Sequence, residues 1–133
     1  MLKSLSSVEG EISVLVASPS EEFWQHVNVF LEDYKAYNLK WFKSIDEIME
    51  FSDSSFNPAL AIVDSVGGTL ACAEWVQSTK MTFSNSQLLI LYSSEHPVDF
   101  SILKKNGADA MMHFNYDQEF FADMVLKMAP VEF

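Results

Sequence analysis

Asp64 is the residue of this sequence that is best placed to do chemistry. It follows a short apolar run, Ala59–Val63, which lies between Pro58 and the pair Gly67-Gly68. An apolar run of this length between turn residues predicts a strand buried on both faces, as in parallel sheets. Ligand sites of open parallel sheets lie beyond the carboxyl ends of the strands, which is where Asp64 falls. Asp64 is therefore a candidate site carboxylate, and the structural alternative is that it only caps the next loop.

A hydroxyl group occupies the corresponding place on the next predicted strand, because Ser93 ends the run Gln87–Ser93. The other reactive side chains form no recognisable catalytic or metal-binding pattern. The three histidines lack the spacing of a metal triad, and their order supports no Ser–His–Asp arrangement. The pair Gly67-Gly68 lacks the further glycines and the lysine of a phosphate-binding loop. The sequence therefore predicts no metal and no cofactor.

The amino-acid composition indicates one globular domain and argues against nucleic-acid and membrane binding. The chain has 133 residues, 49% of them hydrophobic, which fits one globular domain. Its net charge is −11, with 19 acidic residues against 8 basic ones, and every basic residue is a lysine. Such a surface repels phosphate backbones and anionic lipids, so we expect neither direct nucleic-acid binding nor membrane binding. The single cysteine, Cys72, and the lack of an apolar run of ~18 residues predict a cytoplasmic protein.

Strand and helix patterns alternate along the chain. The predicted strands are residues 11–17, 38–43, 59–63, 87–93 and 108–113. Two capping boxes, Ser18–Glu21 with proline at the first helical position and Ser44–Glu47, predict helix starts, and further helices are predicted at 69–80, 97–106 and 117–128. Helices between strands imply parallel pairing with right-handed crossovers. The sequence therefore predicts an α/β domain with an open, doubly wound sheet.

The order of these elements resembles a response-regulator receiver domain. Asp64 ends the third predicted strand, Ser93 ends the fourth, and the run Gly107-Ala108-Asp109 precedes the last part of the fifth. The resemblance covers about residues 11–128, leaving a polar leader at 1–10 and a tail at 129–133 that could lead to a further domain. It implies a flavodoxin-like (βα)5 three-layer sandwich with strand order 2-1-3-4-5. It also implies a phosphoacceptor-like position at Asp64 and a switch-hydroxyl-like position at Ser93.

The chain departs from the receiver pattern at the positions that carry charge. Receivers hold magnesium with two acidic residues after the first strand, and the matching positions here are Ser18 and Pro19. The lysine that receivers place after the fifth strand is replaced by Phe114. Magnesium requires oxygen ligands of the carboxylate kind, and phosphoryl transfer depends on positioned charge. The resemblance is therefore to a degenerate form, a pseudo-receiver.

Three functional hypotheses follow. The first is a non-enzymatic signalling module that works without phosphorylation, through a protein partner or a homodimer. The second is an atypical receiver phosphorylated on Asp64, with Glu22 as an improvised metal ligand, although Glu22 is better explained as a partner of the helix dipole. A third, a flavodoxin-like enzyme, has no motif to support it.

The candidate interaction surface lies on the last strand and the last helix. Aromatic residues and methionine are enriched in the cores of protein interfaces. The residues predicted to form this surface are Met112, His113, Phe114, Tyr116 and Phe120. The alternative is that the aromatic side chains fold back and fill the space of the missing site.

Overall fold

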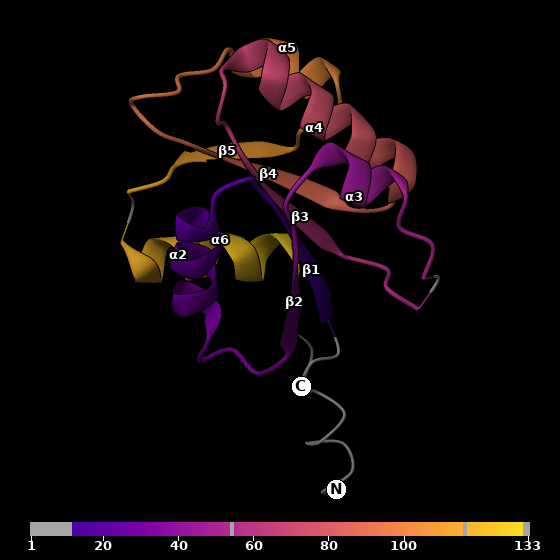
Figure 1. Ribbon diagram of the computed structural model, residues 1–133. Coiled ribbons are helices and arrows are strands. Elements are labelled where there is room, and N and C mark those ends of the chain that lie inside the picture. The colour runs from indigo at the N-terminus through magenta and orange to yellow at the C-terminus, as the bar shows by residue number, and fades with distance from the viewer. Residues whose placement is uncertain (1–11, 54, 116, 132–133) are drawn as a thin grey trace, which may run out of the picture.

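The fold is a five-stranded parallel sheet covered by helices on both faces (Figure 1). A computed structural model describes residues 12–53, 55–115 and 117–131. The strands lie in the order β2-β1-β3-β4-β5, and all pairs are parallel. Their bounds are β1 Ile12–Ala17, β2 Tyr37–Phe42, β3 Leu60–Asp64, β4 Gln87–Tyr92 and β5 Ala110–His113. The predicted (βα)5 fold and its strand order are confirmed.

In the described residues, five helices form the two layers outside the sheet. They are α2 Glu21–Leu31, α3 Ile45–Met49, α4 Thr69–Thr82, α5 Phe100–Lys105 and α6 Gln118–Met128. Helices α2 and α6 cover one face of the sheet, and α3, α4 and α5 cover the other (Figure 1). Successive residues of a strand point to opposite faces, so Val14 and Val16 pack under α2 and α6 while Leu15 and Ala17 pack on the other side. The central strands are therefore buried on both faces.

Two helix starts differ from the prediction. The predicted capping box at Ser18 is wrong, because the N-cap of α2 is Ser20, whose Oγ accepts a hydrogen bond from the Phe23 N–H at 3.2 Å. Pro19 therefore precedes the helix. Helix α5 begins at Phe100, not at Pro97, because extended Asp99 caps it by accepting from the Ser101 N–H.

The other predicted cap is confirmed. Ser44 Oγ accepts from the Glu47 N–H at 3.1 Å. The Glu47 carboxylate in turn accepts from the Lys43 N–H at 2.9 Å, one residue before the position expected in a capping box. Ser44 therefore satisfies a backbone donor that the helix itself leaves unpaired, and Glu47 satisfies one in the segment that enters the helix.

The start of the predicted tail packs on the domain. Ala129 is 2% exposed, and its carbonyl accepts a 2.6 Å hydrogen bond from the Tyr37 hydroxyl. Burial raises the pKa of Tyr37 to about 12. The predicted leader at 1–10 and residues 132–133 lie outside the described residues. In the part of the chain that is described, no helix is both long and apolar enough to cross a membrane.

Candidate functional site

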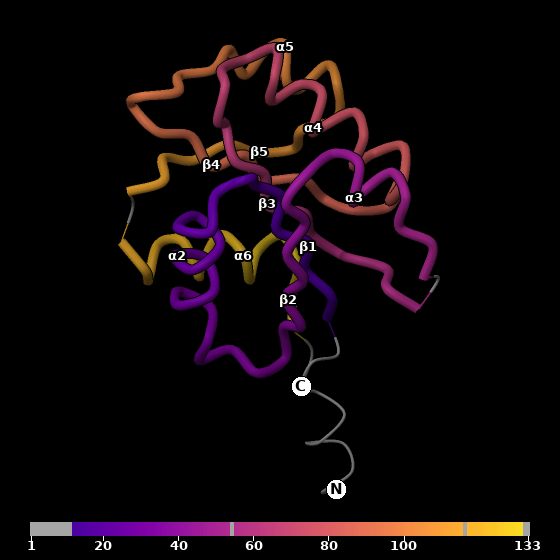
Figure 2. The backbone as a smooth tube through the Cα atoms, in the orientation of Figure 1, coloured from indigo at the N-terminus to yellow at the C-terminus, as the bar shows by residue number. Residues whose placement is uncertain are grey.

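Asp64 lies at the carboxyl edge of the sheet, as predicted. It is the last residue of β3 and pairs in register with Leu91 of β4. The loops that leave β4 and β5 begin at the same edge of the sheet and lie on the left in Figure 2. Strand β3, which lies between β1 and β4, therefore places the half-buried carboxylate of Asp64 between these loops.

Both oxygens of the Asp64 carboxylate accept hydrogen bonds from the protein. The Ser18 hydroxyl donates to Oδ2 at 2.6 Å, and the Val66 N–H donates to Oδ1 at 3.1 Å. Burial nevertheless raises the pKa of Asp64, while the hydrogen bonds from Ser18 and Val66 and the nearby His96 act in the opposite direction. Asp64 therefore both caps its own loop, as the structural alternative predicted, and faces the candidate site.

Ser18 is held in place by two further hydrogen bonds, and the tryptophan that donates one of them is itself fixed by stacking. Its Oγ accepts from the Ser20 N–H at 2.9 Å, and its carbonyl accepts from Trp41 Nε1 at 2.9 Å. The Trp41 ring stacks on Trp24 with centroids 5.7 Å apart and planes 2° from parallel. Ser18 is 0% exposed, so the residue at the first metal-acid position works as a buried structural link. Sequence analysis missed this role because the serine was assigned to a helix cap.

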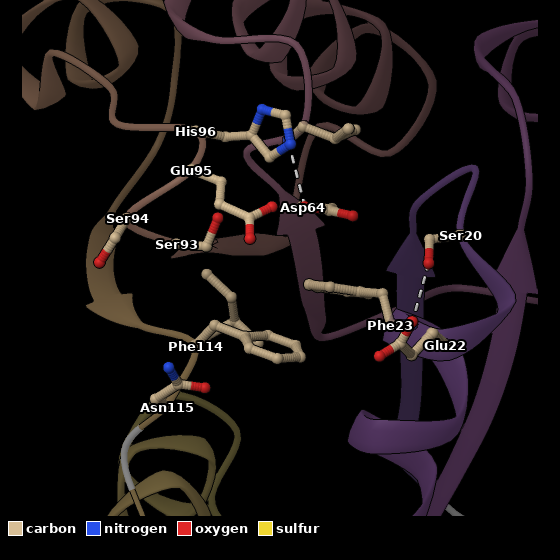
Figure 3. Close-up of a pocket in the computed structure, with 12 residues that line it drawn as sticks. Ser20, Glu22, Phe23, Asp64, Ser93, Ser94, Glu95, His96, Phe114 and Asn115 are labelled. Carbon is tan, nitrogen blue, oxygen red and sulfur yellow. Dashed lines mark hydrogen bonds between the residues drawn. The ribbon is translucent and has the colours of Figure 1, made fainter.

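Asp64 opens onto a surface pocket of about 360 Å³ (Figure 3). Ser93 lines the same pocket, so the structure brings together the two side chains that the sequence predicted at neighbouring strand ends. The lining also includes Glu22 and residues 94–96 of the β4–α5 loop, and Figure 3 shows Glu95 on the side of Asp64 and Ser93. Glu95 was not predicted as a site residue. Its position two residues after a predicted strand end was the available signal.

Phe114 folds back onto helix α2. Its ring stacks on Phe23 with centroids 5.6 Å apart and on His26 with centroids 4.1 Å apart. The Phe114 N–H donates to the Tyr92 carbonyl at 2.7 Å, which fixes the backbone beside β4. Burial lowers the pKa of His26. The residue at the lysine position of receivers therefore closes one side of the pocket with an aromatic ring.

The predicted interaction surface is only partly accessible. Met112 is 3% exposed and belongs to the core under α2 and α6, so its assignment to a surface is wrong. Its side chain faces inward because neighbouring residues of β5 alternate between the two faces. Phe120 is 49% exposed, and His113 and Phe114 are half-buried. Tyr116 lies outside the described residues.

The residues present do not fit a magnesium ion. Among the described residues, no group of three His, Cys, Asp or Glu side chains is arranged to hold a metal ion. Ser18 and Pro19 supply no carboxylate, and the oxygens of Asp64 already accept from Ser18 and Val66. A hard cation here would have only one carboxylate at the strand ends, against the several oxygen ligands it requires.

Comparison with solved structures shows a shared fold. A response regulator from Thermotoga maritima matches at 20% identity with a TM-score of 0.71, over 88% of this chain and 96% of that one. Chemotaxis protein CheY4 of Vibrio cholerae matches at 17% identity with a TM-score of 0.71, over 88% and 98%. A response regulator receiver protein from Burkholderia phymatum matches at 16% identity with a TM-score of 0.72, over 90% and 98%.

These likenesses establish that the chain has the CheY-like, flavodoxin-like fold of receiver domains. No family model matches the sequence, and a search of the curated proteins finds no match. The fold alone does not define the function, which therefore depends on the residues of the candidate site.

The stacking of Phe114 leads to a first prediction. Replacing Phe114 with alanine is expected to lower the free energy of unfolding by about 2 kcal/mol, because the half-buried ring loses both aromatic contacts. The pKa of His26 should then rise towards its ordinary value as water reaches the imidazole. Urea unfolding and an NMR titration of His26 measure the two effects. An unchanged His26 pKa in a folded variant would contradict the proposed packing.

Proposed function

We propose that this chain is a receiver-like signalling module that acts without phosphorylation, through protein–protein contacts and without enzymatic activity. One observation carries the proposal: the Asp64 carboxylate is held by the Ser18 hydroxyl at 2.6 Å, at the place where the receiver resemblance expects a metal acid. Phosphoryl transfer depends mainly on positioned charge around the reacting group. A serine, a proline and a phenylalanine at the three expected charged positions leave that requirement unmet.

The proposed contact surface is the β5–α6 side of the domain. Phe120 projects from the first turn of α6, and Phe114 and His113 lie at the end of β5. An exposed aromatic ring on α6 and half-buried rings at the end of β5 are residue types that the cores of protein interfaces favour. The partner is a different protein or a second copy of this chain, and the proposed location is the cytoplasm.

A second candidate function is that of an atypical phosphoacceptor. The observation in its favour is that Asp64 and Ser93 line one pocket that is open to solvent. Phosphorylation of Asp64 would require the carboxylate to leave Ser18 and an outside cation to replace the missing charge. We rank this function below the first because the residues that line the pocket include no lysine or arginine.

One experiment separates the two functions. The protein is incubated with magnesium and acetyl phosphate, or with the beryllofluoride mimic, and followed by intact mass and amide NMR. We expect no mass increase and no shifts at Asp64, Ser93 or Phe114. A metal-competent receiver under the same conditions serves as the positive control. A stoichiometric adduct that disappears in Asp64→Asn would overturn the proposal and establish the phosphoacceptor.

A further inference from the structure

The pocket beside Asp64 combines an aromatic side with carboxylates. Phe23 and Phe114 stack at 5.6 Å and lie together on one side of the pocket in Figure 3. Glu22, Asp64 and Glu95 also line it, so carboxylates come from α2, β3 and the β4–α5 loop. Three separate elements thus bring negative charge to one cavity of about 360 Å³. Serine hydroxyls, His96 and Asn115 complete its polar lining.

Among the twelve lining residues, His96 is the one side chain that can carry a positive charge against these three carboxylates. None of the twelve lining residues is lysine or arginine. The ion pair found in the described part of the chain joins Lys80 and Asp109, which do not line the pocket. The Gly67 N–H donates to His96 Nδ1 at 3.4 Å, which holds the imidazole at the rim of the pocket. The pocket is therefore complementary to a positive charge supplied from outside.

We propose that this pocket receives an arginine side chain from a basic segment of a partner protein. The inference rests on the proposed function, because it names the chemistry by which a partner protein would bind, at a pocket that shares Phe114 with the proposed β5–α6 contact surface. A guanidinium group is planar, stacks on aromatic rings and pairs with carboxylates through two parallel hydrogen bonds. The pocket offers rings on one side and carboxylates on others, which suits a guanidinium better than the compact, strongly hydrated ammonium of lysine.

The occupant is a different protein, not a second copy of this chain. All eight basic residues of the sequence are lysines, so another copy has no arginine to offer. Two copies, each with a net charge of −11, would also repel one another. Charge complementarity therefore favours a partner with a basic segment, and the same charge would speed its association at low ionic strength.

The test uses short capped peptides as probes. Acetyl-Gly-Arg-Gly amide is titrated into the full chain, without magnesium or a phosphodonor, and followed by amide NMR. We expect saturable shifts at Glu95, His96 and Asn115 and a dissociation constant in the millimolar range. The matched lysine peptide should bind at least three-fold more weakly, and the glutamine peptide should cause no shifts. Equal binding of the arginine and glutamine peptides would overturn the proposal.

Charge variants locate the site. Glu22→Gln and Glu95→Gln are each expected to weaken binding about three-fold, as for a partly solvated ion pair. Glu74→Gln is the matched control, because Glu74 is exposed on α4 and does not line the pocket. An equal loss in all three variants would show attraction to the overall charge only and would overturn the proposal. Tighter binding of spermidine than of the arginine peptide would overturn it in favour of a small polyamine.

Failure of this inference is distinguishable from failure of the proposed function. Absence of peptide shifts in a protein that also resists acetyl phosphate would reject the arginine pocket and leave a phosphorylation-independent module. A phosphorylated Asp64 in a protein that still binds the peptide would reject phosphorylation independence and leave the pocket.

Discussion

Replacing Ser18 with alanine is expected to lower the free energy of unfolding by about 2–3 kcal/mol at neutral pH. The substitution removes the 2.6 Å hydrogen bond to the half-buried Asp64 carboxylate and the acceptor of the Ser20 N–H. A buried charge that loses a donor retains its desolvation cost without the compensating interaction. The measurement is urea unfolding of both proteins at a series of pH values.

The pH dependence identifies the part of this loss that belongs to Asp64. Burial raises the pKa of Asp64 above 3.8, so the folded state binds the proton more tightly than the unfolded state. The free energy of unfolding therefore falls as the pH rises from the unfolded-state pKa of Asp64 to its folded-state pKa. Above the folded-state pKa, the full cost of the charged carboxylate in the folded protein is present. Because Ser18→Ala raises the folded pKa further, its effect should shrink as the pH falls through the folded pKa of the variant and then that of the natural protein, both of which lie above 3.8.

Asp64→Asn supplies the control for this experiment. The neutral amide carries no ionisation penalty. This variant should therefore lose the part of the pH dependence that comes from Asp64, and it should be more stable than the natural sequence at neutral pH. In the Asp64→Asn background, Ser18→Ala should cost only about 1 kcal/mol. Equal costs in the two backgrounds would mean that the Ser18–Asp64 interaction is not charge-assisted.

Gly67→Ala is expected to lower the free energy of unfolding by about 3 kcal/mol, because it adds a steric clash to backbone strain. Gly67 has a φ of +88°, and a Cβ at this position would lie 2.7 Å from the Cβ of Ala71 in the first turns of α4. Neither atom can turn away, since both are fixed to backbone. The Gly67 N–H also donates to His96, so the β4–α5 loop should shift with it. Thermal unfolding and amide shifts at Val66 and His96 measure both effects.

Gly107→Ala is the matched comparison. Gly107 also has a positive φ, +123°, but the atom nearest to its added Cβ is Cγ of Lys80, at 2.7 Å. A lysine stem can change rotamer, so we expect a loss of only about 1–2 kcal/mol, mostly from the backbone. If both alanine variants lost the same free energy, the clash with Ala71 would not contribute to the effect at Gly67.

The fold could be predicted from the sequence because its signals are local and repeated. Buried apolar runs such as Ala59–Val63 alternate with helical patterns, and this alternation admits few topologies. The Ser44 cap could also be predicted, because the N–H group that donates to Ser44 belongs to Glu47, only three residues further along the chain. The positions of Asp64 and Ser93 follow from the rule that parallel strands end at one edge.

The rest of the site depends on contacts between residues far apart in the sequence. Ser18 bonds to a residue 46 positions away, and a local motif that resembled a helix cap concealed that partner. Phe114 packs on Phe23 and His26, which no spacing within the last strand could indicate. Met112 appeared accessible only because β5 is too short for its alternation to be read reliably.

The stacked indole pair gives this protein a spectroscopic signal next to the candidate site. Trp24 and Trp41 are nearly parallel at 5.7 Å, close enough for their excited states to mix and to produce a paired band in circular dichroism. Because Trp41 Nε1 donates to the Ser18 carbonyl, a displacement of Ser18 on ligand capture would change that band and the fluorescence of Trp41. Movement at Ser18, which donates to the pocket residue Asp64, can thus be followed in the unlabelled protein.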